Sequence, residues 1–266
     1  MPAILPARLK VKVNQLVEKI AQTEEFTNAL KDILDYYSDR VRKPGRIPSQ
    51  TSLMDSFQVP KQVTRQIETR LSKQLTGEPE IALALADSLW REDWLECRIL
   101  ALKILGWVPP DPPQKILDRL IFWSEQREED HVLDGVFAEG LAGLRIGTPE
   151  IFFDLIESWL TSSQIKDQKL GLRIIPILVQ NKDFHNLPKI LSLLTPFVEQ
   201  VGVIPNPDLV ISLRESAKRS PKETSYFLQR IRAISENQFI NGLIRQIIKE
   251  FPSTIRDELR VITRES

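Results

Sequence analysis

The chain has 266 residues, of which 42% are hydrophobic, and it carries 36 Lys and Arg against 36 Asp and Glu. This length and apolar fraction are sufficient for one large domain or two small ones with a hydrophobic core. A formal net charge of zero argues against a protein that simply coats DNA through its charge. The chain has one cysteine, Cys97, and two histidines, His131 and His185, which excludes an internal disulfide and disfavours a His/Cys zinc site.

No targeting or membrane segment is expected. The N-terminus lacks the apolar core of about 7–15 residues that a signal peptide requires. The longest purely apolar stretch, Ile174–Val179, is short and contains a proline. We therefore expect a cytoplasmic monomer without disulfides, metal or cofactor.

Charge is distributed unevenly along the chain. Residues 1–77 carry 13 basic and 8 acidic side chains, whereas residues 78–160 carry 7 and 17. Residues 161–207 carry 5 and 3, and residues 208–266 carry 11 and 8. An acidic middle between basic ends would orient a charged partner, and solvated acidic helix faces would give the same pattern.

Apolar residues recur at helical spacing along almost the whole chain. Examples are the stripe of Leu9, Val13 and Leu16 and the stripe of Leu243, Ile244 and Ile247. No alternating strand with a hairpin turn is apparent. Prolines precede many of the apolar runs, as expected for the first turn of a helix, and Pro176 lies inside one and should kink it. We predict roughly a dozen or more helices with short connections, and the longest irregular stretch at residues 39–50.

A weak internal repeat runs through the middle of the chain. Three similar segments end at Trp90, Trp123 and Trp159, which are 33 and 36 residues apart. A small residue follows each in a second helix: Ala101, Gly140 and Gly171. A period in the mid-thirties built from helix pairs is typical of an α-solenoid, whose concave face usually binds an extended partner. We predict that the tryptophans are core residues and that the small residues allow neighbouring pairs to approach closely.

Three stretches resemble the HEAT-like-repeat DNA alkylation repair family, the alkylpurine DNA glycosylases. The first is Ser56-Phe57-Gln58-Val59-Pro60 with Leu89-Trp90 and Glu96-Cys97-Arg98, similar to a family pattern with Gly-Val and Pro, Leu-Trp and Glu-x-Arg. The second is Asp130-His131-Val132-Leu133-Asp134, at the place of Trp-x-x-x-Asp. The third is Leu213-Arg214-Glu215 with Lys218, which matches Leu-Arg-Glu-x-x-Lys. The resemblance covers roughly residues 50–230.

The resemblance implies an all-α, right-handed α-solenoid of HEAT-like helix pairs in a single domain. We place N-terminal helices and a basic loop at residues 1–48, the repeat solenoid at 49–235 and extra C-terminal helices at 236–266. It also implies that duplex DNA binds in the concave face and that cationic alkylated purines are excised. A carboxylate would stabilise the oxocarbenium-like sugar, two tryptophans would pack on the deoxyribose and an arginine would grip a phosphate.

Only part of that site carries over to this sequence. Asp134 matches the catalytic aspartate, whereas Asp130 and Ile211 stand at the two tryptophan positions. Lys169 stands at the arginine position, and Arg173, one turn later, could take the place of that arginine as the phosphate contact. Losing two aromatic contacts, each worth about 1–3 kcal/mol, could remove a few powers of ten in affinity or rate.

Acidic residues crowd around Asp134. Glu128, Glu129, Asp130 and Asp134 lie within seven residues, where they would repel a phosphate backbone. They could open a helix, as acidic residues do at N-termini, or bind Mg²⁺ or Ca²⁺, although the glycine and spacing of an EF-hand are missing. Our prediction is that no metal binds.

Two interpretations of the third motif stay open. Arg214 and Glu215 either tether one repeat to the next or contact DNA. Further candidates for phosphate contacts are basic residues that could equally be ordinary solvated surface: Lys218, Arg219, Lys222, Arg42, Lys43 and Arg46.

The first functional hypothesis is a divergent DNA alkylation repair protein that binds duplex DNA with weakened or lost excision. The alternative is a non-enzymatic solenoid scaffold for a protein partner that has lost the DNA site. A binder that recognises DNA shape without excision is a third. A cysteine hydrolase is disfavoured because Cys97 has no histidine nearby in sequence and should be buried, and scattered glycines give no phosphate loop.

Overall fold

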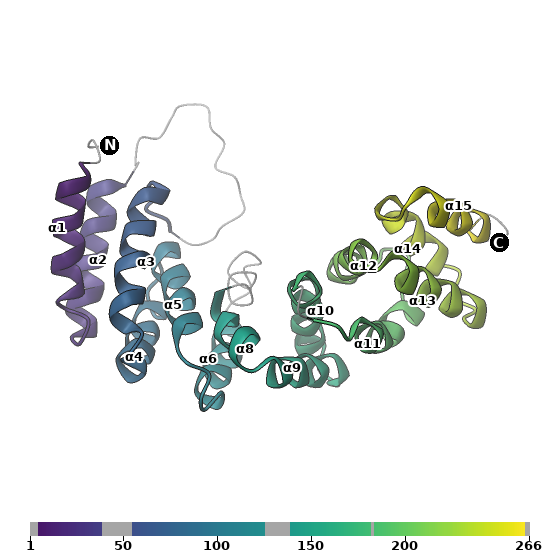
Figure 1. Cartoon of the computed structure of the whole chain (residues 1–266), viewed down its shortest axis with the longest axis horizontal. Coiled ribbons are helices and arrows are strands. Elements are labelled where there is room, and N and C mark those ends of the chain that lie inside the picture. Colours follow the sequence, from purple (N-terminus) through teal and green to yellow (C-terminus); the bar gives the residue numbers. More distant parts are fainter. Residues whose placement is uncertain (1–4, 39–54, 126–138, 182–183, 264–266) are drawn as a thin grey trace. The chain divides into compact units, whose positions relative to one another are not determined.

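The computed structural model describes residues 5–38, 55–125, 139–181 and 184–263 (Figure 1). Regular structure in these residues is helical, apart from one isolated bridge between Asp55 and Trp94. This confirms the all-α prediction. The predicted irregular stretch at residues 39–50 lies outside the described residues. Contacts divide the chain into two units, Met1–Pro149 and Glu150–Ser266, which are described separately.

Several helices of the N-terminal unit contact the helix after next. Its helices are α1 (Pro6–Val17), α2 (Thr23–Tyr37), α3 (Lys61–Leu75), α4 (Pro79–Trp90), α5 (Leu95–Trp107), α6 (Gln114–Glu125) and α8 (Ala142–Gly147). Helix α1 packs against α3, α3 against α5 and α5 against α8, while α2 packs against α4. The contacts of α1 with α3, α3 with α5 and α2 with α4 therefore join alternate helices.

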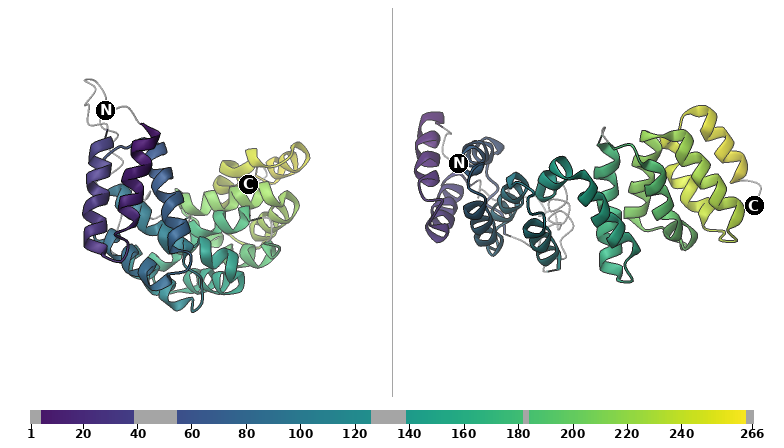
Figure 2. Two further views of the ribbon diagram at one scale, coloured as in Figure 1. Left: turned by 60° about the vertical axis from the view of Figure 1, so that its left-hand side comes forward. Right: turned by 60° about the horizontal axis from the view of Figure 1, so that its bottom comes forward.

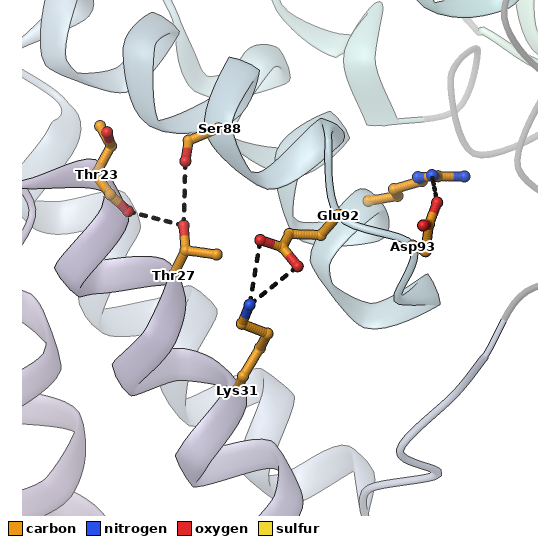
Figure 3. Close-up of polar contacts among 7 residues, drawn as sticks. Thr23, Thr27, Lys31, Ser88, Glu92 and Asp93 are labelled. Atoms are coloured by element: carbon orange, nitrogen blue, oxygen red, sulfur yellow. Dashed lines mark hydrogen bonds and ion pairs between the residues drawn. The ribbon is translucent and has the colours of Figure 1, made fainter.

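Polar contacts join the first helix pair to the next (Figure 3). The Thr27 hydroxyl donates to the carbonyl of Thr23 at 2.8 Å and lies 3.2 Å from the Ser88 hydroxyl. The Lys31 ammonium pairs with the Glu92 carboxylate at 3.1 Å. These contacts join α2 to α4 through Ser88 and to the turn after α4 through Glu92.

The C-terminal unit has the same construction. It contains α9 (Pro149–Thr161), α10 (Ile165–Gln180), α11 (Leu187–Glu199), α12 (Pro207–Arg219), α13 (Pro221–Ile234), α14 (Ile240–Ile247), a 3₁₀ turn η2 (Ile248–Glu250) and α15 (Ser253–Ile262). Helices α10, α12 and α14 pack in sequence, and so do α11, α13 and α15. Both views in Figure 2 show this unit's helices in green to yellow.

Prolines mark helix starts as the sequence predicted. Pro79, Pro149, Pro207 and Pro221 are the first residues of their helices, where the missing N–H would have no intrahelical partner. Pro176 lies inside α10, as predicted. A second internal proline, in α11, was not anticipated: Pro196.

The repeat tryptophans are core residues, which confirms that prediction. Trp90 and Trp123 are 3% and 2% exposed, and their rings stack with centroids 4.5 Å apart. Trp159, in the C-terminal unit, is also buried. A Cβ at Gly171 would lie 2.8 Å from the Leu160 side chain, so this glycine allows α10 to approach α9, the first helix of its own pair. Close approach of neighbouring pairs at the small residues stays a prediction.

Polar links between helices recur at about one repeat length. Arg119 binds Asp87 over a separation of 32 residues, and Lys189 binds Glu157 over 32. Arg173 binds Asp208 over 35 residues. These separations match the 33- and 36-residue spacing of the tryptophans, so equivalent positions of successive helix pairs contact each other within each unit.

Candidate nucleic-acid interface

Helices α10 and α12 form the surface on which most of the described candidates lie. The buried Ser212 hydroxyl donates to the carbonyl of Leu172 at 2.7 Å. At the C-terminal end of α10, the Gln180 amide donates to the Glu215 carboxylate at 3.1 Å. These contacts fix the register of α12 against α10, so residues of the two helices are held in a defined arrangement.

Arg173 is engaged in this helix packing. Its Nε donates to Oδ2 of Asp208 at 3.2 Å, and the two side chains are 17% and 20% exposed. Asp208 belongs to the first turn of α12, where a carboxylate is favourable. The guanidinium proposed as a substitute phosphate contact therefore already has a carboxylate partner.

Lys169 and Ile211 lie on the same two helices and are more open to solvent. Lys169 is exposed on α10, one turn before Arg173. It has no ion pair within the part of the chain that the structure describes. Ile211 is 46% exposed on α12. The surface therefore offers a cation and an aliphatic side chain at the positions where the resemblance implies an arginine and a tryptophan.

The Leu-Arg-Glu-x-x-Lys motif contacts neighbouring helices. Nη2 of Arg214 donates to the carbonyl of Gln246 at the end of α14, at 3.1 Å. The Lys218 ammonium donates to the Glu215 carboxylate at 2.7 Å and lies 4.0 Å from that of Glu250. The geometry supports the tether interpretation of Arg214 and Glu215.

The hydrogen bond between Lys218 and Glu215 affects both titrations. Donation from the ammonium holds the pKa of the Glu215 carboxyl below its ordinary 4.5. The same contact raises the pKa of Lys218 above 10.5. At neutral pH both groups are charged, and each charge stabilises the other.

Two basic candidates lie at the junction of α12 and α13. Nη2 of Arg219 donates to the carbonyl of Phe184 at 3.4 Å, and Lys222 is exposed in the first turn of α13. The remaining candidates, Asp134, Asp130, Arg42, Lys43 and Arg46, lie outside the described residues. Among the described residues, no group of three or more His, Cys, Asp or Glu side chains converges as a metal site would require.

The first motif builds a turn around one carboxylate. Glu96 accepts hydrogen bonds from the Ser56 hydroxyl at 2.8 Å, the Phe57 amide at 3.1 Å and the Gln58 amide at 2.9 Å. The Phe57 ring stacks on Trp94 with centroids 3.8 Å apart. Gln58 has φ of 53°, a left-handed conformation that favours glycine. That is the position where the family pattern has Gly.

Arg98 and Cys97 of the same motif are interior residues. The Arg98 side chain is fully buried; its Nε donates to the Trp90 carbonyl at 3.2 Å and its Nη2 to the Asp93 carboxylate at 2.9 Å. Cys97 is buried as predicted, and burial raises the pKa of its thiol to about 12. A thiol with that pKa is protonated at neutral pH and is a poor nucleophile.

Sequence comparison assigns the chain to a family. A family model described as DNA alkylation repair enzyme matches residues 42–258. The chain belongs to this family. No match was found among curated proteins or among solved structures. The family match covers both units, including the α10–α12 surface and the Glu96 turn.

Within the described ranges, no helix combines the length and the apolar character needed to cross a bilayer.

Proposed function

We propose that this chain is a duplex-DNA-binding member of the DNA alkylation repair family in which excision of cationic alkylated purines is weakened or lost. Family membership supports the DNA role. The observation that carries the proposal is that Lys169 on α10 is exposed and that Ile211 on α12 is 46% exposed. A cation there suits a phosphate, whereas an aliphatic side chain offers no ring to pack on a deoxyribose.

The architecture that goes with this function is a right-handed α-solenoid of HEAT-like helix pairs with DNA in its concave face. Contacts between alternate helices within each unit support it, as do polar links over 32 and 35 residues. In this proposal the protein is a cytoplasmic monomer, and Asp134 is the residue that would stabilise the oxocarbenium-like sugar as the cationic base leaves.

Excision is tested with duplex DNA that contains 7-methylguanine. Free base is measured after incubation with the wild type and with Asp134→Asn. We expect release close to that in buffer, because two aromatic contacts worth about 1–3 kcal/mol each are absent. Rapid release that Asp134→Asn abolishes would show that excision is intact and would contradict this part of the proposal.

The alternative is a protein-interaction scaffold, and one observation favours it. The cations of Arg173, Arg214 and Lys218 all bind groups of the protein itself, and the net charge of the chain is zero. Binding to unmodified and abasic duplex at low salt separates the two functions. Absence of binding would favour the scaffold and equally exclude a binder of DNA shape.

A further inference from the structure

The C-terminal unit has an open groove that is lined by residues of α13 and α15 and by Arg219 at the end of α12. Helices α13 and α15 pack side by side (Figure 1). Its volume is about 650 Å³, within the range of small-ligand sites. Basic, hydroxyl-bearing and aromatic side chains line it together with two prolines. The groove is formed by residues that lie about 30 positions apart, at the starts of two different helices.

The groove carries positive charge from side chains. Arg219 at the end of α12 and Lys222 of α13 line one side, and Glu258 of α15 is the acidic lining residue. Lys222 is exposed and has no ion pair among the residues that the structure describes. Lys222 therefore supplies a positive charge that attracts an anion to this side of the groove.

Backbone dipoles add to this attraction. Helices α13 and α15 both begin at the groove, and neither has a side-chain cap hydrogen bond. The first-turn residues Lys222, Thr254 and Ile255 are lining residues, and amides of a first turn have no intrahelical acceptor. Such amides support a phosphate that the side-chain cations attract.

An aromatic side chain is the second distinctive feature of the groove. Tyr226 lines it and is 70% exposed, which is unusual for a large ring. Pro221, Pro252 and Ile255 provide the apolar surface around it. A ring open to solvent beside cations is the arrangement by which proteins stack a base while holding its phosphate.

We propose that this groove binds a short segment of single-stranded DNA. Lys222 holds a phosphate, and an unpaired base stacks on Tyr226. A base within an intact duplex is covered by its neighbours and is not available for such stacking, so the ligand is a single strand or a frayed end. The groove includes Arg219 at the end of α12 but neither Lys169 nor Ile211, so single-strand binding here does not depend on duplex binding at those two residues.

The test uses the full chain and a fluorescein-labelled oligothymidylate of about ten nucleotides, with affinity measured by anisotropy. We expect Tyr226→Ala to weaken binding about tenfold and Tyr226→Phe to change it less than about twofold, because the ring face is kept. Lys222→Gln should weaken binding several-fold and lower the salt dependence. Arg230→Gln removes an exposed charge of α13 outside the groove and should have little effect.

Any one of three results would overturn the proposal. The first is that the oligonucleotide does not bind at low salt, and the second is that Tyr226→Ala binds it as tightly as the wild type. The third is that Lys222→Gln and Arg230→Gln lose the same amount of affinity for it. Competition by an oligoglutamate peptide as effective as unlabelled oligothymidylate would assign the groove to an acidic peptide instead. Binding to a blunt duplex hairpin is measured in parallel. Tyr226→Ala should leave it unchanged, so failure of the groove and failure of the duplex proposal are distinguishable.

Discussion

The guanidinium of Arg173 donates to the carboxylate of Asp208 at 3.2 Å, across a sequence separation of 35 residues. Gln180 and Glu215 are linked over the same separation. Both contacts join α10 to α12 at equivalent positions of successive helix pairs. The arginine that could replace the family's phosphate contact is therefore part of the helix packing, and exposed Lys169 is the better placed cation.

Arg98 should be a large contributor to stability. Its side chain is fully buried and bonds the Trp90 carbonyl. Arg98→Ala leaves a cavity and an unpaired carbonyl, and we expect the free energy of unfolding to fall by about 2–4 kcal/mol. The Asp93 carboxylate is 87% exposed and adds little to this cost. Urea denaturation measures the change.

The matched control for that variant is Arg91→Ala, which truncates an exposed arginine at the end of α4. Its free energy of unfolding should lie within about 0.5 kcal/mol of the wild type. Equal losses in the two variants would mean that burial of Arg98 does not stabilise the fold.

Gln58 stands in a left-handed conformation that a side chain disfavours. Gln58→Gly should remove that cost, and we expect the free energy of unfolding to rise by about 0.5–1 kcal/mol. Gln66→Gly, inside α3, should instead lower it by about 1 kcal/mol. Thermal denaturation compares both variants with the wild type; a destabilised Gln58→Gly protein would count against the conformation of the Glu96 turn.

Gly171 is closely packed against α9. A Cβ there would lie 2.8 Å from the Leu160 side chain, so Gly171→Ala should lower the free energy of unfolding by about 1–3 kcal/mol. Gly242→Ala, in α14 with nothing within 4 Å of the added Cβ, should raise it by about 0.5–1 kcal/mol. Denaturant unfolding measures both variants. If the free energy of unfolding changed in the same direction in Gly171→Ala and Gly242→Ala, packing around the added Cβ would not distinguish the two sites.

The contact between Glu215 and Lys218 predicts a pH-dependent stability. Because the pKa of Glu215 is lowered from 4.5 in the folded protein, the unfolded chain binds the proton more readily. The stabilisation is therefore present above pH 4.5 and is lost as the pH falls through the folded pKa. Wild type should exceed Glu215→Gln in stability at neutral pH, and the difference should shrink in acid.

The Lys218→Gln background provides the control. Without the ammonium that lowers the Glu215 pKa, the Glu215→Gln change should alter the pH dependence much less. Denaturant titrations compare wild type with Glu215→Gln, and Lys218→Gln with the double variant. They are carried out between pH 3 and pH 7, a range that brackets the ordinary pKa of the carboxyl. A difference that grows toward acid would contradict the contact.

Helices, their starts and much of the core could be predicted from the sequence, because apolar periodicity and proline position are local signals. The buried Leu9, Val13 and Leu16 of α1 and the stacked Trp90 and Trp123 are examples. The division into two units could not be predicted, since a stripe shows that a helix is buried on one face but not which helix covers it.

Contacts between residues far apart in the sequence could not be predicted from the sequence either. The partner of Arg173 is 35 residues away, and the groove at Tyr226 needs the starts of α13 and α15 together. Gln58 is a residue type that rarely marks a left-handed turn, so its own identity gave no signal. The signal was the glycine at this position in the family pattern that the chain resembles.

The most direct test of the account is the salt dependence of duplex DNA binding by the wild type and by Lys169→Gln. The account predicts binding at low salt, with a slope of log affinity against log salt that corresponds to several phosphates. It also predicts that Lys169→Gln reduces the slope by about 0.9, the value for one phosphate contact. Absence of binding at low salt, or an unchanged slope and affinity in Lys169→Gln, would contradict the claim that α10–α12 is the duplex interface.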